Sequence, residues 1–152
     1  MSSEQHIPAP RDDVWRALND PEVLKRCIPG CESIEQESLD SFRITMLAAV
    51  GPVKARFNGK LAIQDSVPPK GYALAFEGSG GMAGFGKGTA TVSLSEADGG
   101  TLLNYTASAQ VSGKLAQVGS RLIDGVARKL AAEFFTRFNA TFAPSAAATA
   151  DT

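Results

Sequence analysis

The feature that most constrains this fold is a long amphipathic segment near the C-terminus, residues 114–143. Apolar side chains recur in it at steps of three and four, the spacing that places them on one helical face; they are Leu115, Val118, Leu122, Val126, Leu130, Phe134 and Phe138. Each four-residue step overshoots a helical turn by about 40°, so the apolar stripe drifts around the axis. We expect one long helix whose last phenylalanines lie well off the line of Leu115.

The chain before this helix alternates apolar and polar residues, which is typical of strands with one buried face. The alternation fills residues 31–111 in about six runs, and a short strand at residues 5–7 precedes it. Two short helices are expected between them, at residues 14–18 and 22–26. A sheet with one apolar face needs a cover, and the long helix supplies it. The predicted fold is α+β, an antiparallel sheet curled around a long C-terminal helix, with two short helices near the N-terminus.

Composition is that of one ordinary globular domain. The 152 residues are 43% hydrophobic, enough for a substantial core, and the net charge of −1 gives no field that would attract nucleic acid. We expect the domain to span residues 1–143 and the Ala/Thr-rich residues 144–152 to be a disordered tail. No apolar run reaches the roughly 20 residues that cross a bilayer, and the N-terminus does not resemble a signal peptide, so we expect a cytoplasmic protein.

The inward-facing positions of the predicted strands alternate between two sizes. Large side chains stand at Phe42, Ile44, Phe57, Phe76 and Tyr105, whereas Ala48, Ala55, Ala90, Ala107 and Ala109 are small. Sheet and helix backbones stay about 10 Å apart, so small residues either draw the elements together or leave space. Two interpretations stay open: a ligand cavity, or a core in which longer helix side chains fill the gap.

The least regular stretch is the glycine-rich segment at residues 78–88. Its Gly86-Lys87-Gly88 leads into a strand-like run rather than a helix, so it does not fit a phosphate-binding loop. The glycines suit a bent hairpin with bulges. They also suit a lip over a cavity mouth with Met82 and Phe85 as its large apolar groups, and both interpretations can hold.

Side chains suited to catalysis or metal binding are scarce. His6 is the only histidine, and Cys27 and Cys31 stand without further ligands, so we expect no catalytic residue, no metal site and two reduced thiols. Arg121, Asp124 and Arg128 are spaced for an ion-pair row on the solvated face of the helix. Arg121 could instead turn inward and donate a hydrogen bond to a ligand carbonyl.

Four separated blocks, residues 7–31, 50–57, 77–88 and 113–123, carry a family resemblance. They include IPAPRDDVWRALNDPEVL, CIPGC, VGPVKARF and GKLAQVGSRLI. In this order they resemble the family of the carbon monoxide dehydrogenase G subunit, over nearly the whole chain up to Phe142. That family belongs to the START/Bet v 1-like (SRPBCC) helix-grip superfamily, so the resemblance implies a sheet wrapped around a long helix and an apolar cavity.

The resemblance also implies a function. It implies a non-catalytic accessory protein that recruits a molybdenum-containing hydroxylase, such as carbon monoxide dehydrogenase, to the cytoplasmic membrane. It further implies quinone binding that links the enzyme to the respiratory chain. Many members continue into a hydrophobic or amphipathic C-terminal segment, whereas this sequence stops at Thr152. We therefore expect membrane or partner contact from the aromatic end of the long helix, with at least one of its four phenylalanines exposed: Phe134, Phe135, Phe138 and Phe142.

The sequence thus predicts a carrier with a hydrophobic cavity, no cofactor other than a bound quinone or similar apolar ligand, and peripheral membrane contact. The residues expected to line the cavity are Phe57, Phe76, Met82, Phe85, Tyr105, Val118 and Leu122, with Arg121 as a polar contact. Tyr105 is expected to place its hydroxyl on a quinone carbonyl. Two alternatives stay open: a cyclase- or hydratase-like cavity enzyme of the same superfamily, and a protein-docking module without a ligand.

Overall fold

The computed structural model describes the backbone of residues 2–150 and the side chains of residues 2–142. Seven strands form one antiparallel sheet in the order β1-β7-β6-β5-β4-β3-β2. The elements along the chain are β1 (Ser2–Ile7), α1 (Arg11–Leu18), α2 (Pro21–Cys27), β2 (Cys31–Ser38), β3 (Ser41–Val50), β4 (Val53–Val67), β5 (Gly71–Ser79), the 3-10 turn η1 (Gly81–Ala83), β6 (Phe85–Ala97), β7 (Gly100–Ser112), α3 (Lys114–Gln117) and α4 (Ser120–Ala150).

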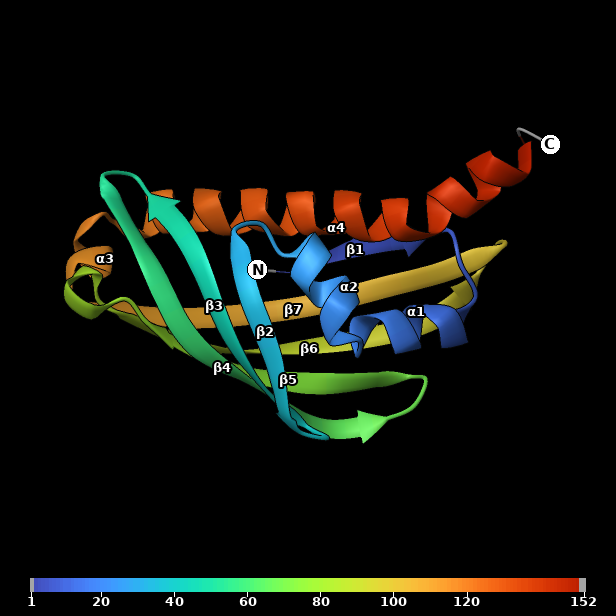
Figure 1. Cartoon of the computed structure of the whole chain (residues 1–152), viewed down its shortest axis with the longest axis horizontal. Helices are drawn as coiled ribbons and strands as arrows, with labels where there is room; N and C mark the ends of the chain where they lie inside the picture. The colour runs from blue at the N-terminus through green and yellow to red at the C-terminus, as the bar shows by residue number, and fades with distance from the viewer. Residues whose placement is uncertain (1, 151–152) are drawn as a thin grey trace.

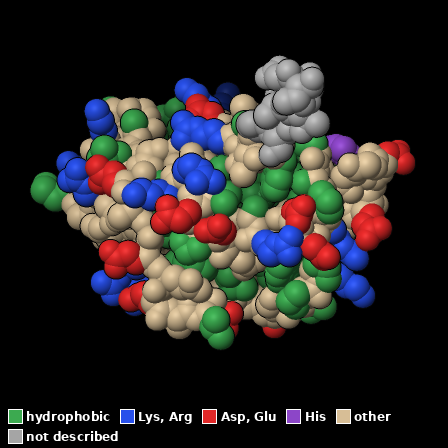
Figure 2. All heavy atoms as spheres, turned by 45° about the vertical axis from the view of Figure 1, so that its right-hand side comes forward, with side chains coloured by type: hydrophobic (Ala, Val, Ile, Leu, Met, Phe, Trp, Pro, Cys, Tyr) green, Lys and Arg blue, Asp and Glu red, His purple; other side chains and the backbone are tan. Residues whose placement is uncertain are grey.

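The sheet curls around α4, which lies along its concave side (Figure 1). The short helices α1 and α2 occupy one end of the molecule, and η1, α3 and the β3–β4 turn occupy the other. This arrangement confirms the predicted helix-grip fold. Figure 2 turns the α1 end toward the viewer and shows acidic and basic side chains mixed among hydrophobic ones on that face.

Local signals explain where the short helices begin. The Asp20 carboxylate accepts a hydrogen bond of 2.9 Å from the backbone N–H of Glu22, and Pro21 stands in the first turn of α2. In α1, Asp12 and Asp13 lie in the first turn, where a negative charge suits the helix dipole. These two helices then pack Val14, Leu18 and related side chains against the sheet.

The hydrophobic core is concentrated at the α1/α2 end. Ile7, Val14, Leu103 and Phe138 are each at most 1% exposed and belong to one buried cluster. Thr101 is also fully buried, and its hydroxyl donates a 2.8 Å hydrogen bond to the backbone carbonyl of Ala9. Loss of that donor would leave a buried carbonyl without a partner.

The long helix is divided, which corrects the expectation of one continuous helix over residues 114–143. The four-residue α3 ends before Val118, and α4 begins only at Ser120. Between them Gly119 adopts a φ of +93°, a left-handed conformation that ends a helix and that glycine reaches without steric cost. Hydrophobic spacing passes through this break undetected because the apolar residues on both sides keep their helical steps. The expected tail at residues 144–152 falls on residues whose side chains lie outside the described part, and its disorder stays a prediction.

The aromatic end of α4 is packed into the core. Phe138 is 0% and Phe135 8% exposed, and Phe134 and Phe142 are partly buried against the same cluster. Neighbouring rings lie close together, with centroids 5.6 Å apart for Phe134–Phe138 and 5.3 Å for Phe138–Phe142. The expectation that one of these rings is exposed is therefore wrong. The drift of the stripe turns this part of α4 toward α2, where Cys27 Sγ lies 3.9 Å from Thr141 Oγ1.

Candidate functional site

Two apolar hollows lie between the sheet and α4. The inner hollow, of about 290 Å³, is closed by Leu18 and Leu24 from α1 and α2. The wider hollow, of about 410 Å³, lies toward the other end, where Leu115 of α3 lines it. Ile28 and Leu61 line both hollows, so the two adjoin each other. Together they supply an elongated apolar space along the helix, which supports the cavity interpretation over a filled core.

Small residues explain why space remains at the wider hollow. Gly59, Gly78 and Gly86 stand on three successive strands among its lining residues, together with Ala48 and Ala109. Glycine and alanine project little or nothing from the sheet, and the helix backbone cannot approach closely enough to compensate. The lack of side-chain volume on the sheet thus leaves room below α4.

Two phenylalanine rings lie against further glycines. The Cζ atom of Phe76 lies 2.7 Å from where a Cβ of Gly88 would stand, and Cε1 of Phe57 lies 2.6 Å from the corresponding position on Gly80. A side chain at either glycine would displace the ring. The rings are therefore held close against the backbone, and both residues line the wider hollow as predicted from the sequence.

The inner hollow has two polar groups, both phenols. Among its lining residues, all of which have described side chains, only Tyr72 and Tyr105 carry a side-chain oxygen or nitrogen. Tyr105 is one of the residues that the sequence predicts here. Its ring stacks on Phe135 at 5.6 Å with an interplanar angle of 21°, which fixes the direction of the hydroxyl.

Sequence reasoning does not single out Tyr72, which the structure places deepest. It is 7% exposed, and the edge contact of its ring with Trp15, at 5.4 Å and 85°, holds it in place. Burial is the sole cause that raises the pKa of Tyr72, and no group in the described part of the chain forms a hydrogen bond with its hydroxyl. The available signal is a polar tip at an inward position of β5, one strand step from Leu74.

Other residues predicted to line the cavity lie elsewhere. Met82 is 83% exposed, Leu122 39% and Phe85 37%. Phe85 belongs to the outward-facing set of β6, because the inward set begins at Gly86 and continues through Ala90. These three side chains therefore do not enclose a ligand in this structure.

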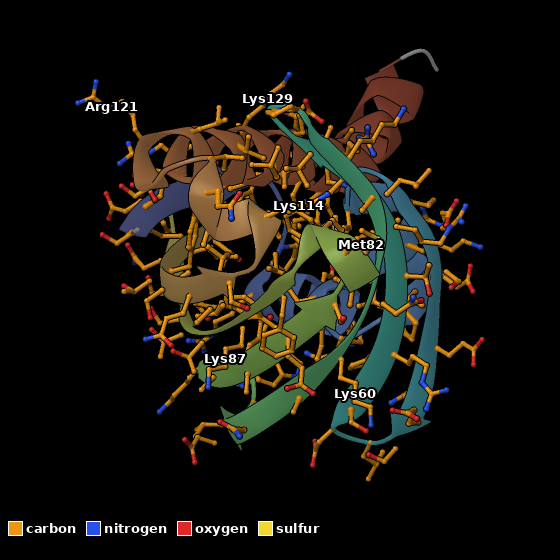
Figure 3. All side chains as sticks on the ribbon, turned by 90° about the vertical axis from the view of Figure 1, so that its left-hand side faces the viewer. Lys60, Met82, Lys87, Lys114, Arg121 and Lys129 are labelled. Atoms are coloured by element: carbon orange, nitrogen blue, oxygen red, sulfur yellow. The ribbon has the colours of Figure 1, made fainter. Side chains whose placement is uncertain are left out.

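The remaining two predicted residues lie at the break between α3 and α4. Arg121 is exposed and projects away from the body of the molecule (Figure 3), so the ligand-facing interpretation of this side chain is not supported. Val118 is half-buried in the break itself and lines neither hollow. Both placements follow from Gly119, which reorients the chain just where the two residues stand.

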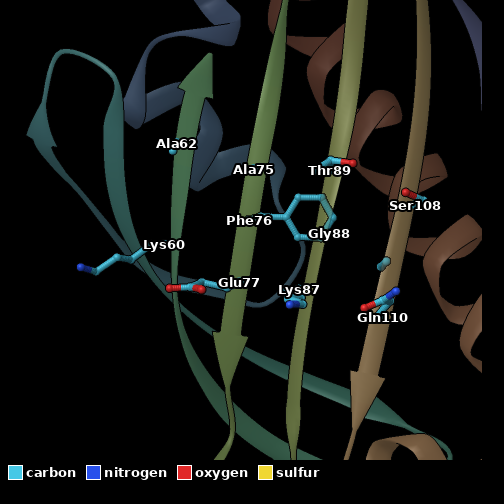
Figure 4. Close-up of a pocket in the computed structure, with 11 residues that line it drawn as sticks. Lys60, Ala62, Ala75, Phe76, Glu77, Lys87, Gly88, Thr89, Ser108 and Gln110 are labelled. Atoms are coloured by element: carbon cyan, nitrogen blue, oxygen red, sulfur yellow. The ribbon is translucent and has the colours of Figure 1, made fainter.

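A third hollow, of about 690 Å³, lies on the outer face of the sheet and differs in character (Figure 4). Lys60, Glu77, Lys87 and Gln110 stand opposite one another on β4, β5, β6 and β7 and give it a charged rim. Small residues form its floor. Because it is shallow, charged and outside the sheet, it does not extend the apolar space beneath α4.

No metal centre is indicated by the described residues, since they contain no group of three His, Cys, Asp or Glu side chains able to hold an ion. Cys27 and Cys31 are free thiols, and burial raises the pKa of each. No helix within the described part is long and apolar enough to cross a membrane.

Comparison with known proteins assigns the chain to a family. The model of a family described as the G subunit of carbon monoxide dehydrogenase (CoxG) matches residues 4–143. No curated protein sequence matches. Among solved structures, a conserved protein from Geobacillus kaustophilus is 32% identical with a TM-score of 0.88, over 95% of both chains.

More distant structures share the fold alone. Ara h 8.0201 is 18% identical with a TM-score of 0.62, over 93% of this chain and 95% of that one. The Zhui aromatase/cyclase from Streptomyces sp. R1128 is 12% identical with a TM-score of 0.62, over 93% and 91%. The same wrapped sheet thus occurs in proteins of different kinds, so the function must be argued from the site.

Proposed function

This chain belongs to the CoxG family of carbon monoxide dehydrogenase, and on that premise we propose that it is a carrier for an apolar ligand with a polar head. The observation that carries the proposal is the pair of adjoining hollows beneath α4, in which the inner one is apolar except for two phenols. Such a site gains affinity from burying apolar surface, at about 25 cal/mol per Å², and orients its ligand through a few polar groups.

A quinone suits this arrangement. Its carbonyl oxygens accept hydrogen bonds, and a phenol hydroxyl can donate one. The head would lie in the inner hollow near Tyr72 and Tyr105, and the apolar tail would follow the wider hollow toward α3. Phe57 and Phe76 supply flat apolar surface along that path.

The partner that we propose is a molybdenum-containing hydroxylase such as carbon monoxide dehydrogenase. In this role the protein would recruit the enzyme to the cytoplasmic face of the membrane as a peripheral protein and pass reducing equivalents to the bound quinone. Family membership supports the partner. Pull-down of the hydroxylase by variants that still bind ligand would separate this docking role from ligand carriage.

The ligand can be tested through Trp15, the only tryptophan. Its ring packs against Tyr72 at the inner hollow, so a quinone bound there should quench its fluorescence. We expect saturable quenching by a short-chain, water-soluble quinone. Absence of saturable binding, together with no quinone in extracts of the purified protein, would remove the proposal.

A matched pair of variants tests the location. Ala90 lines the inner hollow, whereas Ala75, on the neighbouring strand, faces the outer hollow. Ala90→Leu should weaken quinone binding at least about ten-fold by occupying ligand space, since overpacking costs roughly 1–3 kcal/mol. Ala75→Leu adds the same atoms outside the cavity and should leave the affinity unchanged.

A cavity enzyme is the alternative raised by the aromatase/cyclase that shares this fold. Such chemistry calls for an acid or base beside the substrate. In the inner hollow the described lining residues offer two phenols and neither a carboxylate nor an imidazole. A bound ligand recovered chemically unchanged after incubation would favour the carrier, and turnover would favour the enzyme.

A further inference from the structure

The end of the molecule that carries η1 and α3 displays an exposed apolar side chain among basic ones. Met82, at the centre of η1, is 83% exposed although it is a large hydrophobic residue. Leu122, in the first turn of α4, is also exposed. Figure 3 looks onto this end, with Met82 and Lys114 near its centre and Arg121 projecting from the rim.

Backbone contacts hold the parts of this surface together. The Cα atom of Gly84 lies 2.8 Å from where a Cβ of Gly113 would stand, so η1 abuts the start of α3. On the other side, Leu122 Cδ2 lies 2.6 Å from the corresponding position on Gly51, in the β3–β4 turn. The surface is therefore one face built from η1, α3, the start of α4 and the β3–β4 turn. We call it the α3 face.

Basic residues gather at the α3 face although the whole chain has a net charge of −1. Residues 114–129 contain four basic side chains and one acidic one. Lys54, Lys114 and Arg121 are exposed, and none forms an ion pair with any side chain that the structure describes. At the opposite end, residues 11–22 contain four acidic and two basic side chains. The charge is thus distributed asymmetrically along the long axis.

The α3 face also borders the wider hollow. Val50 precedes the β3–β4 turn, Leu115 follows Lys114, and Ile123 follows Leu122, and all three line that hollow. A ligand leaving the hollow in this direction would emerge beside Met82 and the basic side chains.

We infer that the α3 face docks on an anionic phospholipid bilayer. Met82 and Leu122 would enter the boundary between headgroups and acyl chains, and the basic side chains would contact lipid phosphates, as at other peripheral membrane surfaces. Two exposed apolar side chains are too few for the buried core of a stable protein interface, which takes about 800 Å² from each partner. The inference rests on the proposed function for one step, because a lipid-soluble ligand has to be exchanged with the bilayer.

Vesicle sedimentation of the full chain tests the inference. Wild-type protein should bind vesicles of phosphatidylcholine mixed with phosphatidylglycerol, bind phosphatidylcholine alone weakly, and lose binding as salt is raised. Lys114→Glu and Arg121→Glu should each weaken binding at least about five-fold, the effect of one basic residue near an anionic surface. Met82→Asp should also weaken it by at least about five-fold, since it removes the inserted group.

Two controls match these variants at other turns. Lys70→Glu reverses an exposed charge in the β4–β5 turn, and Leu39→Asp replaces a residue that is 88% exposed in the β2–β3 turn. Both should bind vesicles like wild type. All replaced side chains are on the surface, so thermal unfolding should confirm an unchanged fold.

Three outcomes would overturn the inference: no binding to anionic vesicles, equal binding to neutral ones, or equal losses in the control variants. Capture of the hydroxylase that requires Met82 and Lys114 in the absence of vesicles would assign the α3 face to a protein partner instead. Quinone titration in solution distinguishes the two proposals. Vesicle binding lost with quinone binding intact rejects only the docking face, and the reverse rejects only the carrier.

Discussion

Replacing Tyr72 by phenylalanine should affect the free protein and its complex in opposite directions. The hydroxyl is buried at the inner hollow and has no hydrogen-bond partner among the described residues. A buried polar group without a partner costs roughly 1–3 kcal/mol, so its removal should leave the free energy of unfolding unchanged or raise it by up to about 2 kcal/mol. For a protein of this size the melting temperature should rise by up to roughly 8 °C.

The quinone complex should lose affinity through the same change. Without the phenol, a ligand carbonyl near Tyr72 has no donor, at a cost of roughly 1–2 kcal/mol, or about a five- to thirty-fold weaker dissociation constant. Tyr105→Phe serves as the companion variant, because that hydroxyl lines the same hollow. An analogue in which hydrogens replace the carbonyl oxygens should bind wild type and Tyr72→Phe equally.

The assay is Trp15 quenching for affinity and urea unfolding of the ligand-free protein for stability. A loss of more than about 1 kcal/mol in the free protein would show that the hydroxyl already has a partner, because only a satisfied group contributes in that direction. Equal quinone affinity of the two proteins would refute the assignment of the head to this end of the cavity.

Further predictions concern the core. Phe138→Ala should lower the free energy of unfolding by about 3–5 kcal/mol in urea, since the ring is fully buried, and a loss below about 1 kcal/mol would contradict that packing. Thr101→Val should cost about 1–3 kcal/mol by leaving the Ala9 carbonyl unpaired, whereas Thr101→Ser should recover most of it. Burial raises the pKa of Tyr72, so stability should fall as pH rises above about 10, where the unfolded chain ionises, and Tyr72→Phe should lessen this fall in melting curves. A thiol reagent should modify Cys31, which is half-buried, before Cys27, which is 1% exposed; equal rates in the folded protein would contradict this order.

The sequence is sufficient for the fold because its signals are periodic and local. Alternation in the strands and three- and four-residue steps in the helix specify which side of each element is apolar, and a curled sheet with one cover satisfies both. The break at Gly119 escapes prediction because the apolar steps continue on either side of it. A single positive φ leaves no periodic trace.

The site is predictable only in part. Phe57, Phe76 and Tyr105 are found because strand alternation assigns their direction. Met82 and Leu122 are misplaced because hydrophobicity alone does not distinguish a lining residue from an exposed one next to a break or a turn. The phenylalanines of α4 illustrate the converse. Drift around the helix predicts exposure, but α2 lies where the drift points and covers them.

The junction of the two hollows at Ile28 and Leu61 gives the cavity a length as well as a volume. A ligand anchored at Tyr72 can add methylene groups along one line only, and each buried group contributes about 0.8 kcal/mol. Once the tail reaches α3, additional carbons leave the protein and contribute nothing. The domain should therefore act as a ruler: across a homologous series its affinity rises with each added carbon and then levels off at the chain length that the two hollows together can hold.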